Sequence, residues 1–181
     1  MFKIDDSTAL RALRKEDAAE LFALTDANRK HLRTWLPWVD VVLAEADSAA
    51  FIETAIAQRE AGRGPTFAVL RDGAIAGIVG FMRPIDRVNR VGEISYWLAA
   101  DAQGHGTMTE CCRFIVHYAF STLDLNRVEI AVATGNLRSR AIPERLGFKF
   151  EGVLRAREAL NGSFVDHALY SQLRAEFDAQ L

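Results

Sequence analysis

Thiols are scarce in this sequence, which contains only two cysteines, Cys111 and Cys112, and these are adjacent. Neighbouring cysteines are poorly placed to bridge each other, and two are too few for a disulfide framework or a structural zinc site. We therefore expect two buried free thiols, and no metal site.

Long apolar runs and an excess of one charge are also missing. No segment approaches the roughly 20 apolar residues that span a membrane, and no N-terminal stretch has the apolar core of a secretory signal. A net charge of −2 and an isoelectric point near 6.1 give no overall attraction to nucleic acid or to an anionic membrane. We expect a cytoplasmic protein that binds neither.

Two common nucleotide-binding motifs are absent as well. No Gly-Lys-Ser or Gly-Lys-Thr occurs, which excludes the Walker pattern. The pair Gly104 and Gly106 could begin a dinucleotide fingerprint, but Thr109 stands where that motif needs Gly or Ala. Both nucleotide classes are therefore disfavoured.

The 181 residues fit a single domain spanning 1–181, with no repeat and no linker. Asp47 or Ser48 is placed to cap a helix that ends at Gly62. Alternating or β-branched runs bounded by turn residues predict about seven strands. These are Thr8–Leu13, Thr66–Leu70, Ile75–Met82, Val91–Leu98, 128–133, Phe148–Leu160 and Ser163–Leu173.

The most informative stretch runs from Leu98 to Phe120, where a strand passes through a glycine turn into an amphipathic helix. Gly104 and Gly106 let a ligand approach the backbone N–H groups, and a helix start adds partial positive charge. Such a turn suits a phosphate. The alternative is an ordinary turn before a core helix. A strand at residues 128–133 then follows the helix, which predicts a parallel β-loop-α-β unit.

Several further segments, taken together with this unit, resemble the GNAT superfamily of acetyl-CoA-dependent N-acetyltransferases, and in particular the RimJ/RimL type that acetylates ribosomal proteins. The segments are HLRTWLPW, GEISYWL, QGHGTMTE, LNRVEIAVATGNLRSRAIPERLGF and NGSFVDHALYS. The resemblance implies an α+β, three-layer fold with a mixed, mostly antiparallel sheet.

By this resemblance the chain is an acyltransferase that binds acetyl-CoA. The N–H groups of Gln103, Gly104, His105, Gly106 and Thr107 would hold the pyrophosphate. Trp97 and Leu98 would pair with the pantetheine arm, beside Asn136 and Ser139. One departure is Asp101, which occupies a loop position where the superfamily usually has Gln or Arg. A carboxylate there would repel the pyrophosphate, so we expect Asp101 to point to solvent.

Acetyl transfer to an amine requires a base and a proton donor for the departing thiolate. Glu93 is the candidate base because its strand enters the cofactor loop; the alternative is a solvated or ion-paired carboxylate. Ser139 is the candidate acid, unless its hydroxyl only completes a helix cap. Trp35 and Trp38 either wall the substrate pocket or form a lid at the edge of the core.

The expected acceptor is the N-terminal α-amine of a protein such as a ribosomal protein. Deprotonating an α-amine at pH 7 costs about 1 kcal/mol, whereas a lysine costs about 4.6 kcal/mol. A small amine, such as an amino acid, polyamine or antibiotic, is the alternative acceptor, and a non-catalytic acyl-CoA-binding regulator is the alternative class. Exposed apolar residues suggest a homodimer.

Overall fold

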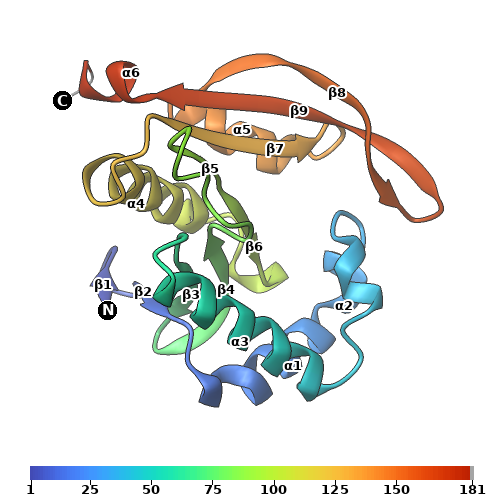
Figure 1. Ribbon diagram of the computed structural model, residues 1–181. Coiled ribbons are helices and arrows are strands. Elements are labelled where there is room, and N and C mark those ends of the chain that lie inside the picture. Colours follow the sequence, from blue (N-terminus) through green and yellow to red (C-terminus); the bar gives the residue numbers. More distant parts are fainter. Residues whose placement is uncertain (180–181) are drawn as a thin grey trace.

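The computed structural model describes residues 1–179 as two β-sheets with helices packed against them (Figure 1). The strands of the first sheet lie in the order β1-β2-β3-β4-β6, and those of the second in the order β5-β7-β9-β8. Their bounds are β1 Phe2–Lys3, β2 Thr8–Ala12, β3 Thr66–Arg71, β4 Ala74–Gly80, β5 Val91–Glu93, β6 Ser95–Leu98, β7 Arg127–Ala133, β8 Lys149–Leu160 and β9 Ser163–Leu173.

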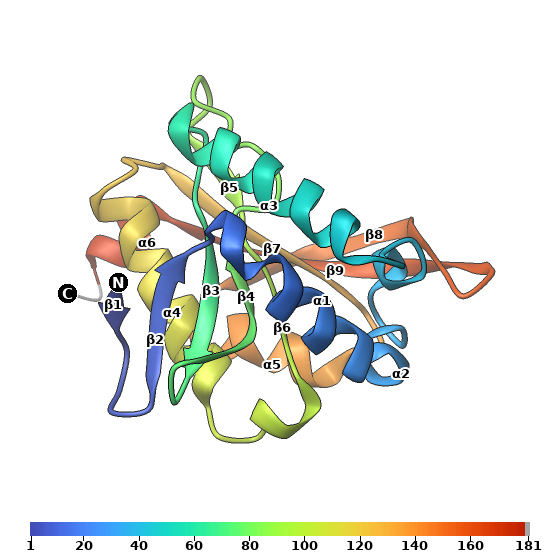
Figure 2. The same cartoon turned by 90° about the horizontal axis from the view of Figure 1, so that it is seen from below.

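The helices cover both faces of the first sheet. Figure 2 shows α1 and α3 side by side in front of β3 and β4, while α4 lies behind them. The α-helices are α1 Ala18–Ala27, α2 Arg29–Leu32, α3 Glu45–Glu60, α4 Thr107–Ser121, α5 Leu137–Arg145 and α6 Arg174–Asp178. Short 3-10 helices are η1 Lys15–Asp17, η2 Pro37–Asp40 and η3 Ala100–Ala102.

The predicted mixed, mostly antiparallel architecture with one central parallel unit is confirmed. All pairings in the described residues are antiparallel except that of β5 with β7, which are joined through α4. Cys111 and Cys112 are fully buried in α4, as expected. The strands divide into two sheets because the expected strand Val91–Leu98 is shared between them.

This division occurs at Ile94, between β5 and β6. The residues before Ile94 pair with β7, whereas Ser95 to Leu98 pair with β4. Gly92 permits the close packing there, since a Cβ on it would come within 2.6 Å of the Phe81 ring. Consequently β6 has a free edge, and the two sheets diverge beyond Ile94. The cavity described below lies where the two sheets diverge.

One expected helix boundary is wrong. Neither Asp47 nor Ser48 is the N-cap of α3, because the helix already begins at Glu45. Asp47 instead lies in the first turn, where its carboxylate accepts hydrogen bonds from the amides of Leu43 and Ala44 at 2.8 and 2.9 Å. From its position inside the helix, the Asp47 carboxylate thus pairs two N–H groups that lie just before the helix.

Among residues 1–179, no helix is both long and apolar enough to cross a bilayer. The same residues contain no cluster of three or more His, Cys, Asp or Glu side chains that could hold a metal ion.

Candidate active site

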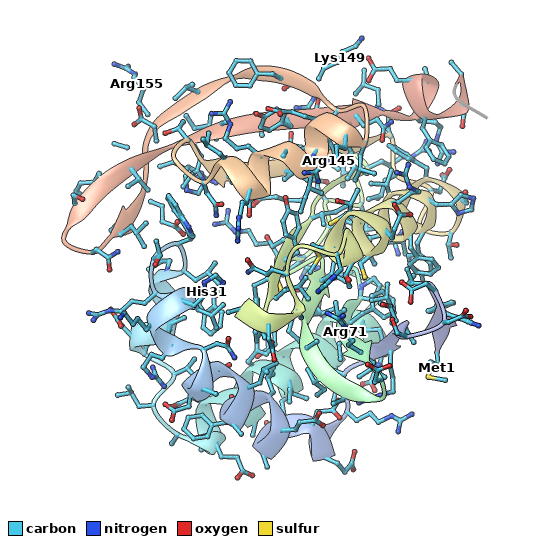
Figure 3. All side chains as sticks on the ribbon, turned by 180° about the vertical axis from the view of Figure 1, so that it is seen from behind. Met1, His31, Arg71, Arg145, Lys149 and Arg155 are labelled. Carbon is cyan, nitrogen blue, oxygen red and sulfur yellow. The ribbon has the colours of Figure 1, made fainter. Side chains whose placement is uncertain are left out.

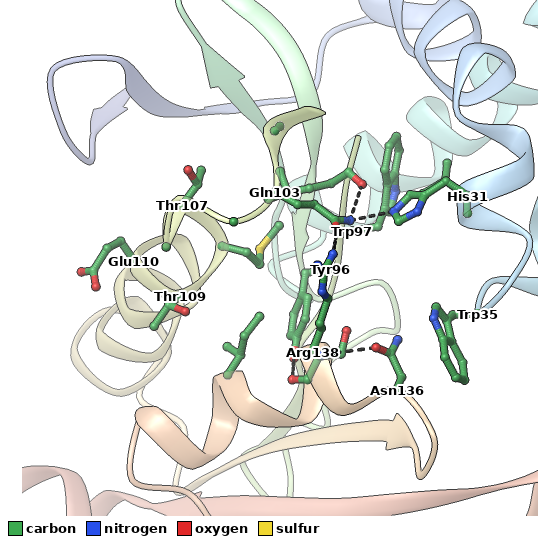
Figure 4. Close-up of a pocket in the computed structure, with 18 of the residues that line it drawn as sticks. His31, Trp35, Tyr96, Trp97, Gln103, Thr107, Thr109, Glu110, Asn136 and Arg138 are labelled. Carbon is green, nitrogen blue, oxygen red and sulfur yellow. Dashed lines mark hydrogen bonds between the residues drawn. The ribbon is translucent and has the colours of Figure 1, made fainter. Parts of the chain in front are cut away.

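A cavity of about 600 Å³ lies where the two sheets diverge. Its walls come from α2, from β6, from the glycine turn with the start of α4, and from α5 (Figure 4). We call it the first cavity. His31 on α2 and Arg145 on α5, which are both labelled in Figure 3, line it from elements far apart in the sequence.

The glycine turn forms one end of this cavity. Gly104 and Gly106 have φ angles of 87° and 77°, which only glycine adopts readily, and a Cβ on either would meet no neighbouring atom within 4 Å. In the described part of the chain, the amides of residues 104–109 donate to no protein acceptor. Free N–H groups at the start of a 15-residue helix make this end of the cavity suited to an anion.

Charged side chains reinforce that preference. Arg113, Arg138 and Arg145 all line the cavity. One carboxylate, Glu110, lies among them and is paired with Arg113 at 3.1 Å. Asp101 is exposed and lies outside the cavity lining, as expected, so it does not oppose a bound anion there.

Trp97 and Leu98, on the free edge of β6, line the cavity beside the turn. The Gln103 side chain connects β6 to α2 and to α5. Its Nε2 lies 3.3 Å from the Leu98 carbonyl oxygen and 2.7 Å from His31 Nε2, and its Oε1 accepts a hydrogen bond from Arg138 at 3.2 Å (Figure 4). His105 is exposed and is not among the residues that line the cavity, although its amide lies within the glycine turn.

Asn136 and Ser139 meet β6 at the start of α5. The Asn136 side chain accepts a hydrogen bond from the Ser139 amide at 3.2 Å, which confirms Asn136 as the cap. The Ser139 carbonyl accepts a hydrogen bond from the Tyr96 hydroxyl at 2.9 Å. Among the described residues, the Ser139 hydroxyl has no hydrogen-bond partner and is therefore not used in capping. It lines the cavity and is free to act on a ligand.

A second cavity of about 400 Å³ lies between β6 and helices α1 and α3. Its lining contains no charged side chain. Leu36, Tyr96 and Trp97 line both cavities, so the two approach each other at β6. Burial raises the pKa of Tyr96 well above its ordinary value of 10, which keeps the phenol protonated at this junction.

The two predicted tryptophans belong to different cavities. Trp35 lines the first cavity and packs close to Gly135, where an added Cβ would come within 3.2 Å of the Trp35 ring. Trp38 lines the second cavity, and its ring centroid lies 5.8 Å from that of Trp97. Each tryptophan therefore walls a pocket, but they do not wall the same one.

Glu93 lies outside the lining of both cavities. It ends β5, two residues before Ser95 of the second cavity, and its side chain is 26% exposed. Arg83 is 4.0 Å away and is itself 68% exposed, so the pair is a loose one. Glu93 therefore does not face either cavity directly.

The structure adds lining residues that the sequence analysis missed, among them His31, Tyr96, Arg138 and Arg145. A signal for two of them was present. Arg138, Ile142 and Arg145 follow helical spacing of four and three residues, so they share one face of α5. No local pattern pointed to His31 or Tyr96.

Comparison with known proteins agrees with this geometry. The profile of the Acetyltransferase (GNAT) domain family matches residues 8–149. A Bacillus subtilis (strain 168) protein named as a ribosomal N-acetyltransferase, YdaF, is 37% identical, and the alignment covers 98% of this chain and 97% of that protein. The ribosomal-protein-serine acetyltransferase of Escherichia coli (strain K12) is 27% identical, with 94% and 95% covered.

Among solved structures, that of the microcin C7 self-immunity acetyltransferase MccE, in complex with acetyl-CoA and AMP, superposes with a TM-score of 0.88. The two sequences are 31% identical, and the match covers 94% of each chain.

Proposed function

The chain belongs to the acetyltransferase (GNAT) domain family, and we propose that it transfers the acetyl group of acetyl-CoA to the N-terminal α-amine of a protein such as a ribosomal protein. Residues 1–181 would act as one catalytic domain. The observation that carries the proposal is that a cavity built for an anion meets an uncharged cavity at the free edge of β6. The named ribosomal acetyltransferases among the relatives favour a protein acceptor.

The residues present fit acetyl-CoA, which supplies an activated acetyl thioester when bound. The free amides from Gly104 to Thr107 would bind its pyrophosphate, with the Gln103 amide beside them. The free edge of β6 at Trp97 and Leu98 would hydrogen-bond the two amides of the pantetheine arm, and Asn136 would lie alongside. The Gln103 side chain must then release the Leu98 carbonyl.

We propose that the reaction is direct attack by the amine. A carbon–nitrogen bond forms, the carbon–sulfur bond breaks, the amine loses a proton and the departing thiolate gains one. Glu93 would receive the amine's proton through water, since Glu93 precedes Ser95 of the second cavity by two residues but lies outside that cavity's lining. The unpartnered Ser139 hydroxyl would donate to the thiolate.

A small amine is the second candidate acceptor. The microcin acetyltransferase structure is a complex with acetyl-CoA and AMP, so a closely similar fold accommodates a ligand smaller than a protein. Trp35 and Trp38 would contact either kind of acceptor, one from each cavity.

Thiol release tests the proposal. The protein would be mixed with acetyl-CoA and a panel of peptides with free N-termini, amino acids and polyamines, and products would be identified by mass spectrometry. We expect acetylation of peptide α-amines, and none of peptides blocked by prior N-acetylation. Release with small amines only would favour the second candidate, and coenzyme binding without release with any amine would contradict both.

We further propose a cytoplasmic enzyme, where ribosomal proteins are made, and a homodimer. Large apolar side chains of the second sheet are exposed and support association, among them Phe150, Val153 and Phe164. Analytical ultracentrifugation would test the dimer.

A further inference from the structure

Helix α5 contains a proline in its interior, and the carbonyl that this proline leaves without a helical donor belongs to Ser139. An α-helix is held by hydrogen bonds from each N–H to the carbonyl four residues earlier. Pro143 has no N–H, so the bond that would end at the Ser139 carbonyl cannot form. The missing bond therefore falls on the residue that we propose as the acid.

The Tyr96 hydroxyl of β6 takes the place of the missing amide. It donates to the Ser139 carbonyl at 2.9 Å, and Figure 4 shows the Tyr96 ring pointing toward the start of α5. Burial raises the pKa of Tyr96 well above 10, so this hydroxyl keeps its proton and remains a donor. A phenol has a single proton, and here that proton is used within the protein. Tyr96 itself is therefore not the proton donor for a departing thiolate.

The same bond ties α5 to the first sheet, whereas other bonds hold α5 to the second sheet. The Tyr170 hydroxyl of β9 donates to Glu144 at 2.7 Å and accepts from Arg140 at 3.0 Å. Among the described residues, the bond from Tyr96 is the one hydrogen bond between α5 and β6. It spans the gap between the strand edge proposed for the pantetheine arm and the residue proposed as acid.

We propose that Tyr96 is a positioning residue for Ser139, and that its hydroxyl sets the distance between the Ser139 hydroxyl and a thioester bound along β6. This inference rests on the proposed function and deepens it. Pro143 makes the arrangement work, because it leaves the carbonyl to Tyr96 and so ties α5 to β6 rather than to its own next turn. A displacement of about 1 Å at a reacting group can cost up to about 100-fold in rate, so one bond at this place affects catalysis.

Tyr96→Phe tests this role because it removes one hydroxyl and keeps the ring. In single-turnover thiol release we expect a loss of about 5-fold, smaller than the roughly 10-fold loss from removing the Ser139 hydroxyl, because a displaced hydroxyl still donates part of the time. Coenzyme A affinity should stay nearly unchanged, since the arm would pair with the backbone of Trp97 and Leu98. In a Ser139→Ala background, Tyr96→Phe should cause no further loss, because the group that it positions is gone.

Pro143→Ala separates positioning from a merely structural role. Alanine supplies the amide that closes the bond to the Ser139 carbonyl within the helix. With Pro143 in place, Tyr96→Phe should lower the melting temperature by about 3 °C, because the carbonyl loses its donor. In a Pro143→Ala background this loss of stability should largely disappear, whereas the loss of rate should remain. If both losses disappear together, Tyr96 only satisfies a carbonyl and the inference is overturned.

Tyr118→Phe is the matched control. Tyr118 lies on α4, packs against Phe67 and Phe114, and lines neither cavity, so its loss of a hydroxyl should leave rate and melting temperature near those of the unaltered protein. Losses that add in the Tyr96→Phe/Ser139→Ala double variant, or an unchanged rate in Tyr96→Phe, overturn the inference while leaving an active acetyltransferase. No thiol release by the unaltered protein with any amine contradicts the proposed function, and the inference with it.

Discussion

The two cavities that meet at β6 are built in different ways. The first is defined largely by backbone: free amides of a glycine turn, the free edge of a strand and the start of a helix, with three arginines around them. The second is defined by side chains from α1, α3 and β4, and none is charged. The first cavity can bind the same ligand even when its side chains vary, whereas the shape of the second cavity changes when a single lining residue is substituted.

This difference has a consequence for how specificity is divided. Backbone donors are the same whatever the sequence, provided that the turn keeps its conformation, so coenzyme binding tolerates variation in most side chains. Under the proposed function, acceptor choice would depend on the individual side chains that line the second cavity, because removing one hydroxyl or adding one methylene alters a close-packed pocket. The predictions below act on one cavity, on the junction, or on neither.

The largest effect is expected from Gly104→Val, which alters the backbone-defined cavity. Valine is strained at a φ of 87°, so the turn would change shape and its amides would no longer converge. We expect coenzyme A affinity, measured by isothermal titration calorimetry, to fall by about 100-fold or more.

Gly73→Val provides the matched control for that variant. Gly73 also has a φ of 87° and open space around its Cα, but it lies in the β3–β4 hairpin and lines neither cavity. Both variants should lose similar thermal stability from backbone strain, and only Gly104→Val should lose the coenzyme. Retained affinity in Gly104→Val would place the coenzyme elsewhere.

The next effect concerns the junction of the two cavities. Glu93→Gln should lower kcat by about 100-fold, since a positioned base commonly contributes at least that much. Coenzyme affinity should be nearly unchanged, because Glu93 lies outside the first cavity. Stopped-flow measurement of thiol release would separate an effect on kcat from an effect on coenzyme affinity. Glu53→Gln, an exposed change on α3, is the control, and unchanged turnover of Glu93→Gln over the whole pH range would remove Glu93 from the mechanism.

Ser139→Ala should have a smaller effect of the same kind. We expect kcat to fall by about 10-fold, because a water molecule can partly replace a hydroxyl as proton donor. The cap of α5 should survive, since Asn136 supplies it and the Ser139 hydroxyl has no part in it. A change confined to coenzyme affinity, with single-turnover rates intact, would contradict the role as acid.

Several residues that the sequence analysis named line the first cavity, because much of that cavity is built from local backbone structure. Gly104, Gly106 and Asn136 act through the backbone within a few residues of their own positions, so turn and capping patterns were enough to find them. The parallel unit around α4 followed from the same kind of pattern.

The second cavity could not be found in this way. Residues 91–98 were predicted as one continuous strand, yet the chain changes sheet at Ile94, where Phe81, distant in sequence, packs close to Gly92. Ser48 was noticed only as a possible cap, and it lines the second cavity together with residues of α1 and β4. Such contacts join residues distant in sequence, and no single segment records them.

The smallest effect is expected where neither cavity is touched. Arg127 on β7 pairs with Glu151 on β8 at 2.7 Å and Ser171 donates to the same carboxylate, which together hold the pKa of Glu151 at about 2. A lowered folded-state pKa stabilises the protein above about pH 4.5, and this contribution disappears as the pH falls toward 2.

Because Glu151 is 36% exposed, we expect Glu151→Gln to cost only about 1 kcal/mol at pH 7. Thermal melts should show a deficit that shrinks below pH 4.5, while coenzyme affinity stays unchanged. A change in coenzyme affinity would mean that this part of the second sheet contributes to the first cavity.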